Sequence, residues 1–193
     1  MPGASGLLLT GGRSRRFGTD KAALRFEGRT LAARGAALLG DVCDVVVEVG
    51  PSHTGLPVAR EEPSGAGPLA ALAAGREALG RLGATGSTIV LAVDLPRVTH
   101  ALLTFLRDWP GAPTVVPEVD GRLQPVCARY GPDAFLAAAS LVADGASSLH
   151  ALLDVVEHDV VREDAWGAVA AADTFADVDS PADAARLGIA LGE

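Results

Sequence analysis

Short apolar runs alternate with longer segments of helical apolar spacing from one end of the chain to the other. Runs without strict alternation are typical of strands that are buried on both faces of a parallel sheet. The predicted strands are Gly6–Leu9, Val42–Val49, Pro57–Arg60, Thr88–Val93, Pro113–Val116, Gln124–Tyr130 and Val160–Arg162. The predicted helices are Thr30–Leu39, Ser64–Leu82, Thr99–Trp109, Pro132–Ala143, Ser147–Val155 and one beginning at Ser180 or Pro181. This order predicts an α/β fold, doubly wound around a mainly parallel sheet.

Two loops of this predicted fold are the places to look for a ligand. Ligands of open parallel sheets lie outside the carboxyl ends of the strands. The loop Thr10–Asp20 follows the first predicted strand, and Asp94 stands at the carboxyl end of the strand Thr88–Val93. A predicted turn, Asp120-Gly121, and a loop through Phe175–Asp179 come later in the chain.

Length and charge narrow the class of protein. The 193 residues suit one domain, and the net charge of −8 argues against nucleic acid and anionic membranes as partners. No run is long and apolar enough for a membrane span, and no signal peptide is recognisable, so we expect a cytoplasmic protein. Cys43 and Cys127 lack CxxC spacing and lie in apolar stretches, which favours two buried free thiols over a metal site or a disulfide.

The loop after the first strand combines glycine with positive charge. Gly11-Gly12 allows the backbone to approach a ligand closely and to direct N–H groups toward an anion. Arg13, Arg15 and Arg16 follow, and then Lys21, the only lysine among 16 basic residues. Taken alone, the arginines are more typical of a solvent-exposed basic loop that binds no ligand. The diglycine and the single lysine together favour a polyphosphate site, although the loop is neither a Walker A motif nor a Rossmann fingerprint.

A second glycine-rich turn, Gly65–Ala70, fits the loose dinucleotide pattern only weakly. Pro68 removes a backbone donor, and no acidic residue ends a strand at the spacing that a ribose partner needs. We interpret Pro68 as a proline in the first turn of a helix. The turn could still border a purine base, with Glu61 or Glu62 accepting hydrogen bonds from it.

Asp94 is a candidate metal ligand, since its carboxylate follows a strand where a metal bridging triphosphate oxygens would lie. Helix capping is the alternative, but Thr99 already suits that role. Asp177 and Asp179 either add carboxylates to the metal or cap the last helix. The four histidines show no paired spacing and are expected at the surface or in packing; they are His53, His100, His150 and His158.

The segment Leu9–Lys21 resembles the signature LAGGxSxRMGxDK of the molybdenum cofactor guanylyltransferases and their sugar-nucleotide pyrophosphorylase-like relatives. Further blocks resemble that family in the same order: Gly67–Ala70 its GPLAG, Asp94–Pro96 its CDxP, Gln124–Ala128 its HP(V/L)xA, and Asp177–Pro181 its NxNTP. The chain departs from the pattern at several positions, with Thr10 for Ala, Phe17 for Met, Val93 for Cys, and Asp177 and Asp179 for Asn.

The resemblance implies a Rossmann-like nucleotidyltransferase fold and an enzyme that attaches GMP from GTP to molybdopterin with Mg²⁺, releasing pyrophosphate. It implies catalytic roles for Lys21, Arg16 and Asp94, and metal binding by Asp94 and Asp179. The nucleotide-binding residues would be Leu9, Thr10, Gly11, Gly12, Arg13, Lys21, Glu61, Gly67 and Asp94. The nucleotide part would cover about residues 1–110 and the acceptor part about 111–193. Transient contact with molybdoenzymes or other cofactor-synthesis proteins is a further expectation.

Three questions stay open at this level. The phosphate loop identifies a triphosphate rather than its base, so CMP transfer to molybdopterin, or transfer to another phosphorylated acceptor, is an alternative. A nucleotide-binding adaptor protein without catalysis is the alternative of another class, which intact Lys21 and Asp94 argue against. The oligomeric state is not predicted.

Overall fold

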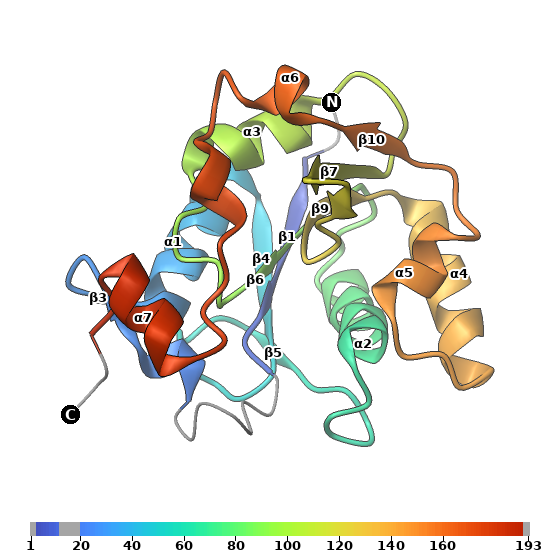
Figure 1. Ribbon diagram of the computed structural model, residues 1–193. Coiled ribbons are helices and arrows are strands. Elements are labelled where there is room, and N and C mark those ends of the chain that lie inside the picture. Colours follow the sequence, from blue (N-terminus) through green and yellow to red (C-terminus); the bar gives the residue numbers. More distant parts are fainter. Residues whose placement is uncertain (1–2, 12–19, 191–193) are drawn as a thin grey trace.

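The computed structural model describes residues 3–11 and 20–190, and it is built around a central sheet of eight strands (Figure 1). The sheet order is β10-β7-β9-β6-β1-β4-β5, with β8 paired to β7. The strands are β1 Ser5–Leu9, β4 Val45–Val49, β5 Val58–Ala59, β6 Thr88–Ala92, β7 Val115–Val119, β8 Arg122–Leu123, β9 Cys127–Tyr130 and β10 Asp159–Val161. A separate two-stranded ribbon consists of β2 Arg25–Phe26 and β3 Arg29–Thr30.

The predicted mainly parallel sheet is confirmed, with one reversal. Strands β6, β1, β4 and β5 are parallel neighbours, and β10 is parallel to β7. Strand β9 is antiparallel to both β6 and β7, because it enters the sheet after the chain has turned back through the β7–β8 hairpin. The turn Asp120-Gly121 is present, and both residues have positive φ, as a tight hairpin turn requires.

Helices cover both faces of the sheet (Figure 1). Helices α2, α4 and α5 pack on one face, and α1, α3 and α6 pack on the other. The helices are α1 Leu31–Val42, α2 Pro68–Arg81, α3 His100–Asp108, α4 Pro132–Ala143, α5 Leu149–Leu153, α6 Glu163–Trp166 and α7 Pro181–Leu187, with 3₁₀ turns η1 Lys21–Ala23 and η2 Ala172–Phe175. This two-sided cover confirms the doubly wound arrangement. Within residues 3–11 and 20–190, no helix is long and apolar enough to cross a membrane.

Several boundaries differ from the predicted ones. Val42 is the last residue of α1 rather than the first of a strand, since the apolar face of the helix runs directly into the apolar strand β4. The β2–β3 ribbon, β8, η1, η2 and α6 are not among the predicted elements, because each is too short to show a period. Strand β8, and not the predicted strand Gln124–Tyr130, pairs with β7 across the Asp120-Gly121 turn. Both cysteines are buried and free, as expected, and burial raises the pKa of each thiol to about 12.

A third apolar cluster joins the two ends of the described chain. Leu24 and Leu31 pack there with Val178 and Leu187 of the C-terminal segment. Val178 also donates its backbone N–H to the carbonyl of Asp94 at 3.1 Å. The segment before α7 is thereby held beside the turn that carries Lys21, far away in sequence.

Candidate active site

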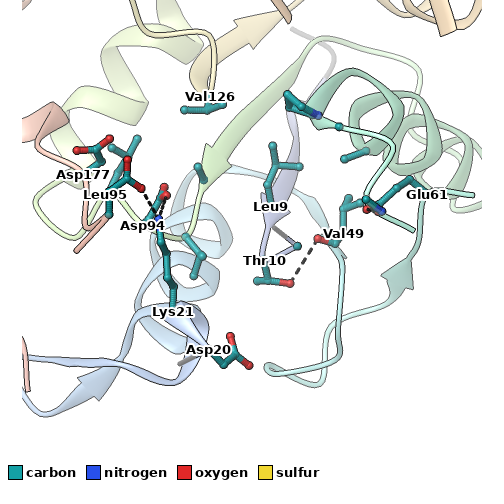
Figure 2. Close-up of a pocket in the computed structure, with 18 of the residues that line it drawn as sticks. Leu9, Thr10, Asp20, Lys21, Val49, Glu61, Asp94, Leu95, Val126 and Asp177 are labelled. Atoms are coloured by element: carbon teal, nitrogen blue, oxygen red, sulfur yellow. Dashed lines mark hydrogen bonds and ion pairs between the residues drawn. The ribbon is translucent and has the colours of Figure 1, made fainter. Parts of the chain in front are cut away.

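A cavity of about 720 Å³ opens at the carboxyl ends of β1 and β6, as expected for ligand sites of this fold class. Figure 2 shows Lys21, Asp94 and Asp177 on one side of it and Glu61 on the other, with Leu9 and Thr10 between. The cavity brings together eight residues that were predicted from sequence: Leu9, Thr10, Gly11, Lys21, Glu61, Gly67, Asp94 and Asp179. Gly12, Arg13 and Arg16, predicted with them, lie outside the described residues.

Lys21 lies between two carboxylates. Its Nζ is 2.9 Å from Asp94 Oδ2 and 2.6 Å from Asp179 Oδ1, and its side chain is 16% exposed. Burial alone lowers the pKa of Lys21, but the charges and hydrogen bonds of the two carboxylates outweigh burial and raise it. Lys21 is therefore a fixed positive charge at neutral pH.

Lys21 is held in place by a short turn. It is the first residue of η1, and Asp20 Oδ1 caps this turn by accepting from Ala22 N at 3.0 Å. Ala22 is buried in the third apolar cluster, whereas Asp20 and Lys21 line the cavity. The turn thus buries the Ala22 side chain in the core while the neighbouring Asp20 and Lys21 side chains face the cavity.

Three carboxylates gather at this end of the cavity. Asp94 comes two residues after β6, and Asp177 and Asp179 flank the buried Val178. Burial, together with the negative charges of Asp179 and Asp94, raises the pKa of Asp177. The two neighbouring carboxylates make the surroundings of Asp177 negative, and such surroundings stabilise a cation.

The capping alternative for the aspartates is wrong. Ser180 caps α7 by accepting from Asp183 N at 3.2 Å, and Thr99 caps α3 by accepting from Leu102 N at 3.2 Å. Asp94 and Asp179 contact Lys21 instead.

The glycine side of the cavity differs from the predicted anion nest. The N–H groups of Thr10 and Gly11 both donate to the carbonyl of Val49, at 3.0 and 3.1 Å. The Gly11 N–H is therefore already engaged, and the expectation that it points at an anion is wrong for this structure. The glycine that the packing requires here is Gly50, where a Cβ would lie only 2.5 Å from Gly11 N, whereas a Cβ at Gly11 would lie 3.6 Å from its nearest neighbour.

The opposite wall is the turn before α2. Glu61 Oε1 accepts from Gly65 N at 3.0 Å, and both residues line the cavity together with Gly67. A Cβ at Gly67 would lie 2.8 Å from the carbonyl of Ser147, so only glycine lets this turn pack there. Pro68 is the first residue of α2, as predicted. Glu62, the other acidic candidate, is not among the residues that line the cavity.

A second cavity, of about 910 Å³, adjoins the first and shares Gln124, Phe175 and Asp177 with it. Arg122 and His150 are the basic residues of its described lining. No functional role is predicted for Arg122, and His150 is expected only at the surface or in packing, because the two residues belong to a two-residue strand and a five-residue helix that no pattern connects. The block Gln124–Ala128 was the available signal for Gln124.

Comparison with known proteins identifies a family and several relatives of this chain. Residues 6–162 match the model of the MobA-like NTP transferase domain. A probable molybdenum cofactor guanylyltransferase from Chloroflexus aggregans is 39% identical over 140 residues, 65% of this chain and 64% of that protein. Another from Mycobacterium avium is 34% identical over 160 residues, 78% of this chain and 80% of that protein.

Solved structures share the fold. Molybdopterin-guanine dinucleotide biosynthesis protein A from Archaeoglobus fulgidus superposes with a TM-score of 0.77 at 20% identity, covering 95% of this chain and 96% of that one. A Mycobacterium tuberculosis protein in complex with manganese gives a TM-score of 0.60 at 20% identity, covering 96% and 97%. At these identities the likeness is one of fold.

Proposed function

The chain belongs to the MobA-like NTP transferase family and is a nucleotidyltransferase, and we propose that it attaches GMP from GTP to molybdopterin with release of pyrophosphate. The observation that carries the proposal is the contact of the only lysine with Asp94 and Asp179, inside the cavity at the carboxyl ends of β1 and β6. Such a cluster suits a triphosphate and its cation rather than an apolar ligand.

The proposed reaction is an in-line displacement. A phosphate oxygen of the acceptor forms a bond to the α-phosphorus of GTP, and the bond from that phosphorus to the bridging oxygen of the β-phosphate breaks. The electron pair leaves with pyrophosphate. No covalent enzyme intermediate is needed, so the protein has to position both substrates and neutralise charge. We assign charge neutralisation to Lys21 and Arg16, and the close backbone approach to Gly11 and Gly12.

The donor set fits a magnesium ion. Asp94 and Asp179 would hold it, and the ion would neutralise charge on the phosphate oxygens. Across residues 3–11 and 20–190, no three acidic, histidine or cysteine side chains form a ready-made metal centre. Mg²⁺ usually takes one or two carboxylates of a protein and completes its shell with substrate phosphates and water. The manganese complex of the Mycobacterium tuberculosis protein supports a divalent ion on this fold.

We propose that Glu61 selects guanine. Its Oε1 accepts from Gly65 N, which orients the carboxylate on the cavity wall, and the N1–H and exocyclic amine of guanine are donors that it can accept. Cytosine offers no matching N1–H. A site built for those donors leaves a polar group unpaired with the wrong base and can reject that base by several orders of magnitude.

We propose that residues of about 111–193 receive the acceptor, while about 1–110 bind the nucleotide. The second cavity supports this division, because its described lining comes from the C-terminal part and it joins the first cavity through shared residues. Arg122 offers positive charge for the phosphate of molybdopterin in a chain whose net charge is −8, and the His150 ring nitrogens can form hydrogen bonds with it.

The test is a product assay with Mg²⁺, molybdopterin and each of the four nucleoside triphosphates. We expect molybdopterin guanine dinucleotide and one pyrophosphate per turnover. CMP transfer would overturn the guanylyl assignment, and nucleotide binding without pyrophosphate release would favour the adaptor alternative.

Glu61→Gln should narrow the preference for GTP over CTP at least ten-fold, because a neutral amide no longer accepts from both guanine donors. Glu62→Gln, whose residue does not line the cavity, is the matched control.

A further inference from the structure

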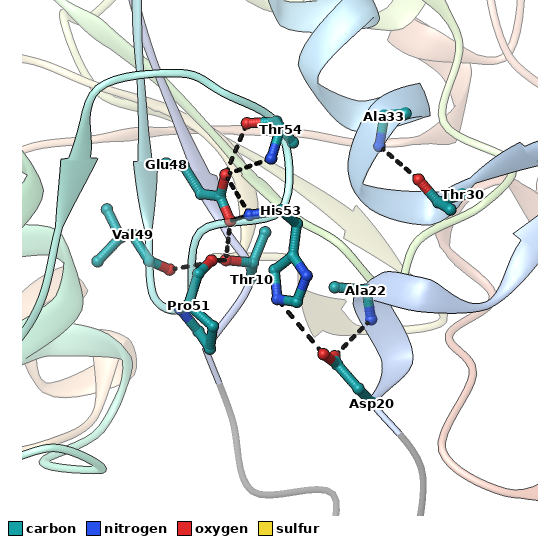
Figure 3. Close-up of polar contacts among 10 residues, drawn as sticks. All are labelled: Thr10, Asp20, Ala22, Thr30, Ala33, Glu48, Val49, Pro51, His53 and Thr54. Atoms are coloured by element: carbon teal, nitrogen blue, oxygen red, sulfur yellow. Dashed lines mark hydrogen bonds and ion pairs between the residues drawn. The ribbon is translucent and has the colours of Figure 1, made fainter.

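A fully buried carboxylate lies beneath the phosphate-binding part of the cavity, at Glu48 of β4. It accepts from three neighbouring residues (Figure 3). Thr10 Oγ1 donates to Oε1 at 2.9 Å, and Thr54 Oγ1 donates to Oε2 at 2.6 Å. The backbone N–H groups of His53 and Thr54 donate to the carboxylate at 2.9 to 3.2 Å.

Such a group needs an explanation, because a buried carboxylate is costly unless it is hydrogen-bonded. Here both oxygens have partners, so Glu48 organises its surroundings rather than meeting a ligand. One of its side-chain partners is Thr10, and the family signature has alanine at this position. The hydroxyl that this chain adds to the signature therefore has its acceptor in Glu48.

The same loop reaches the other end of the signature. The His53 ring extends toward Asp20, and its buried Nε2 lies 3.4 Å from Asp20 Oδ2 without forming a hydrogen bond (Figure 3). Asp20 Oδ1 meanwhile caps the turn that carries Lys21. His53 is thus hydrogen-bonded to Glu48 through its backbone N–H, and its ring lies against the Lys21 turn at Asp20.

We propose that Glu48 and His53 are positioning residues, which form a brace that fixes Thr10–Gly11 and Asp20–Lys21 relative to each other. The brace consists of Thr10, Asp20, Glu48, His53 and Thr54. It connects the residues on either side of the segment 12–19, so it sets where Gly11 and Lys21 face the phosphates. A displacement of about 1 Å in such a group can cost up to 10²-fold in rate. The proposal rests on the proposed function for its effect on nucleotide binding.

The experiment compares two pairs of variants. His53→Phe keeps a ring and removes its nitrogens, whereas His53→Gln keeps a polar side chain that can face Asp20. Thr10→Val removes the hydroxyl, whereas Thr10→Ser keeps it. His100→Phe, at an exposed histidine on α3, is the matched control.

We expect His53→Phe and Thr10→Val to weaken GTP affinity and turnover about ten-fold through misplacement of Lys21. His53→Gln, Thr10→Ser and His100→Phe should stay within about three-fold of the wild type, on the same reasoning. In a Lys21→Ala background, His53→Phe should cause no further loss of GTP affinity, because it acts through that lysine. Amide hydrogen exchange at Ala22 should become faster in His53→Phe without any ligand.

Other outcomes overturn the brace. Wild-type affinity and turnover in His53→Phe and Thr10→Val would do so. If His53→Phe weakens GTP affinity equally in the Lys21→Ala background, the brace has a purely structural role. The same holds if the loss of activity follows the melting temperature and is also present in His53→Gln and Thr10→Ser. If the wild type binds no GTP, the proposed function fails instead. Exchange at Ala22 then decides the brace by itself, and an unchanged rate rejects it.

Discussion

Lys21 occupies a position that arginine fills poorly. Its ammonium is a compact charge that touches Asp94 and Asp179 at once, at 2.9 and 2.6 Å. A guanidinium is planar and longer, so its rigid fork cannot place a single nitrogen between the two carboxylates as the ammonium does. The other 15 basic residues are arginines, so a positive charge alone does not explain the single lysine. The compact shape of its ammonium group does.

Lys21→Ala should lower the transfer rate about 10²-fold or more, since a phosphate-facing cation stabilises the transition state by roughly 3 kcal/mol. Lys21→Arg should also be poor, because the planar fork cannot reproduce the two contacts. Single-turnover rates at saturating GTP measure both, and circular dichroism checks the fold. Full turnover by the arginine variant would contradict the geometric argument.

Asp94 carries the metal prediction at the same scale. Asp94→Asn should raise the Mg²⁺ concentration needed for half-maximal activity, because an amide oxygen has no net charge to hold a hard cation. Activity is measured across a magnesium titration, with Asp41→Asn on the exposed end of α1 as control. An unchanged magnesium requirement combined with a large fall in melting temperature would identify Asp94 as structural.

At the scale of elements, helix α2 lies close enough to the sheet to require glycine. A Cβ at Gly75 would lie 2.7 to 2.8 Å from side-chain atoms of Leu7 and Val49, whereas a Cβ at Gly80 would meet nothing within 4 Å. Gly75 is therefore a packing residue and Gly80 is not. The close approach brings the start of α2, with Gly67, to the cavity.

The two glycines predict opposite effects in one helix. Gly80→Ala should raise the free energy of unfolding by about 0.5–1 kcal/mol through helix propensity. Gly75→Ala should lower it by about 1–2 kcal/mol, since overpacking costs more than propensity returns. Urea denaturation of both variants measures these differences. Equal stabilisation by the two alanines would show that the helix can move away from the sheet without cost.

At the scale of the whole molecule, the site exists because distant segments meet. Val178 packs with Leu24 and Leu31 and donates to the Asp94 carbonyl, which brings Asp179 to Lys21, 158 positions away. A ligand bound in the cavity would contact β1, the end of the central strand β6 and the C-terminal segment before α7. Ligand binding should therefore stabilise the fold as one unit.

GTP with Mg²⁺ at about 100 times its dissociation constant should add about 2.7 kcal/mol to the free energy of unfolding. For a chain of this length that raises the melting temperature by roughly 5–10 °C. Thermal unfolding across a GTP series measures the shift, and Lys21→Ala should lose most of it. A GTP series without any shift in the wild type would contradict nucleotide binding at the site.

Much of the fold follows from local patterns. Long apolar runs and helical periods are properties of neighbouring residues, so the order of the main strands and helices, the Asp120-Gly121 turn and the caps Thr99 and Ser180 could be predicted from the sequence. The motifs likewise placed Lys21 at the end of the loop after the first strand and Asp94 at the end of a strand, and both line the cavity. Short elements such as η1 and the β2–β3 ribbon carry too few residues to show a period.

Other features depend on contacts between distant residues, which one sequence does not display. The reversed strand β9 depends on pairing with both β6 and β7, and the role of Asp179 depends on the packing of Val178. His53 gave no motif, because its importance arises only where its loop meets Glu48 and Asp20. Sequence alone determined which chemistry the chain carries; tertiary structure decided which side chains meet, since apolar packing and buried polar pairing act across the whole chain.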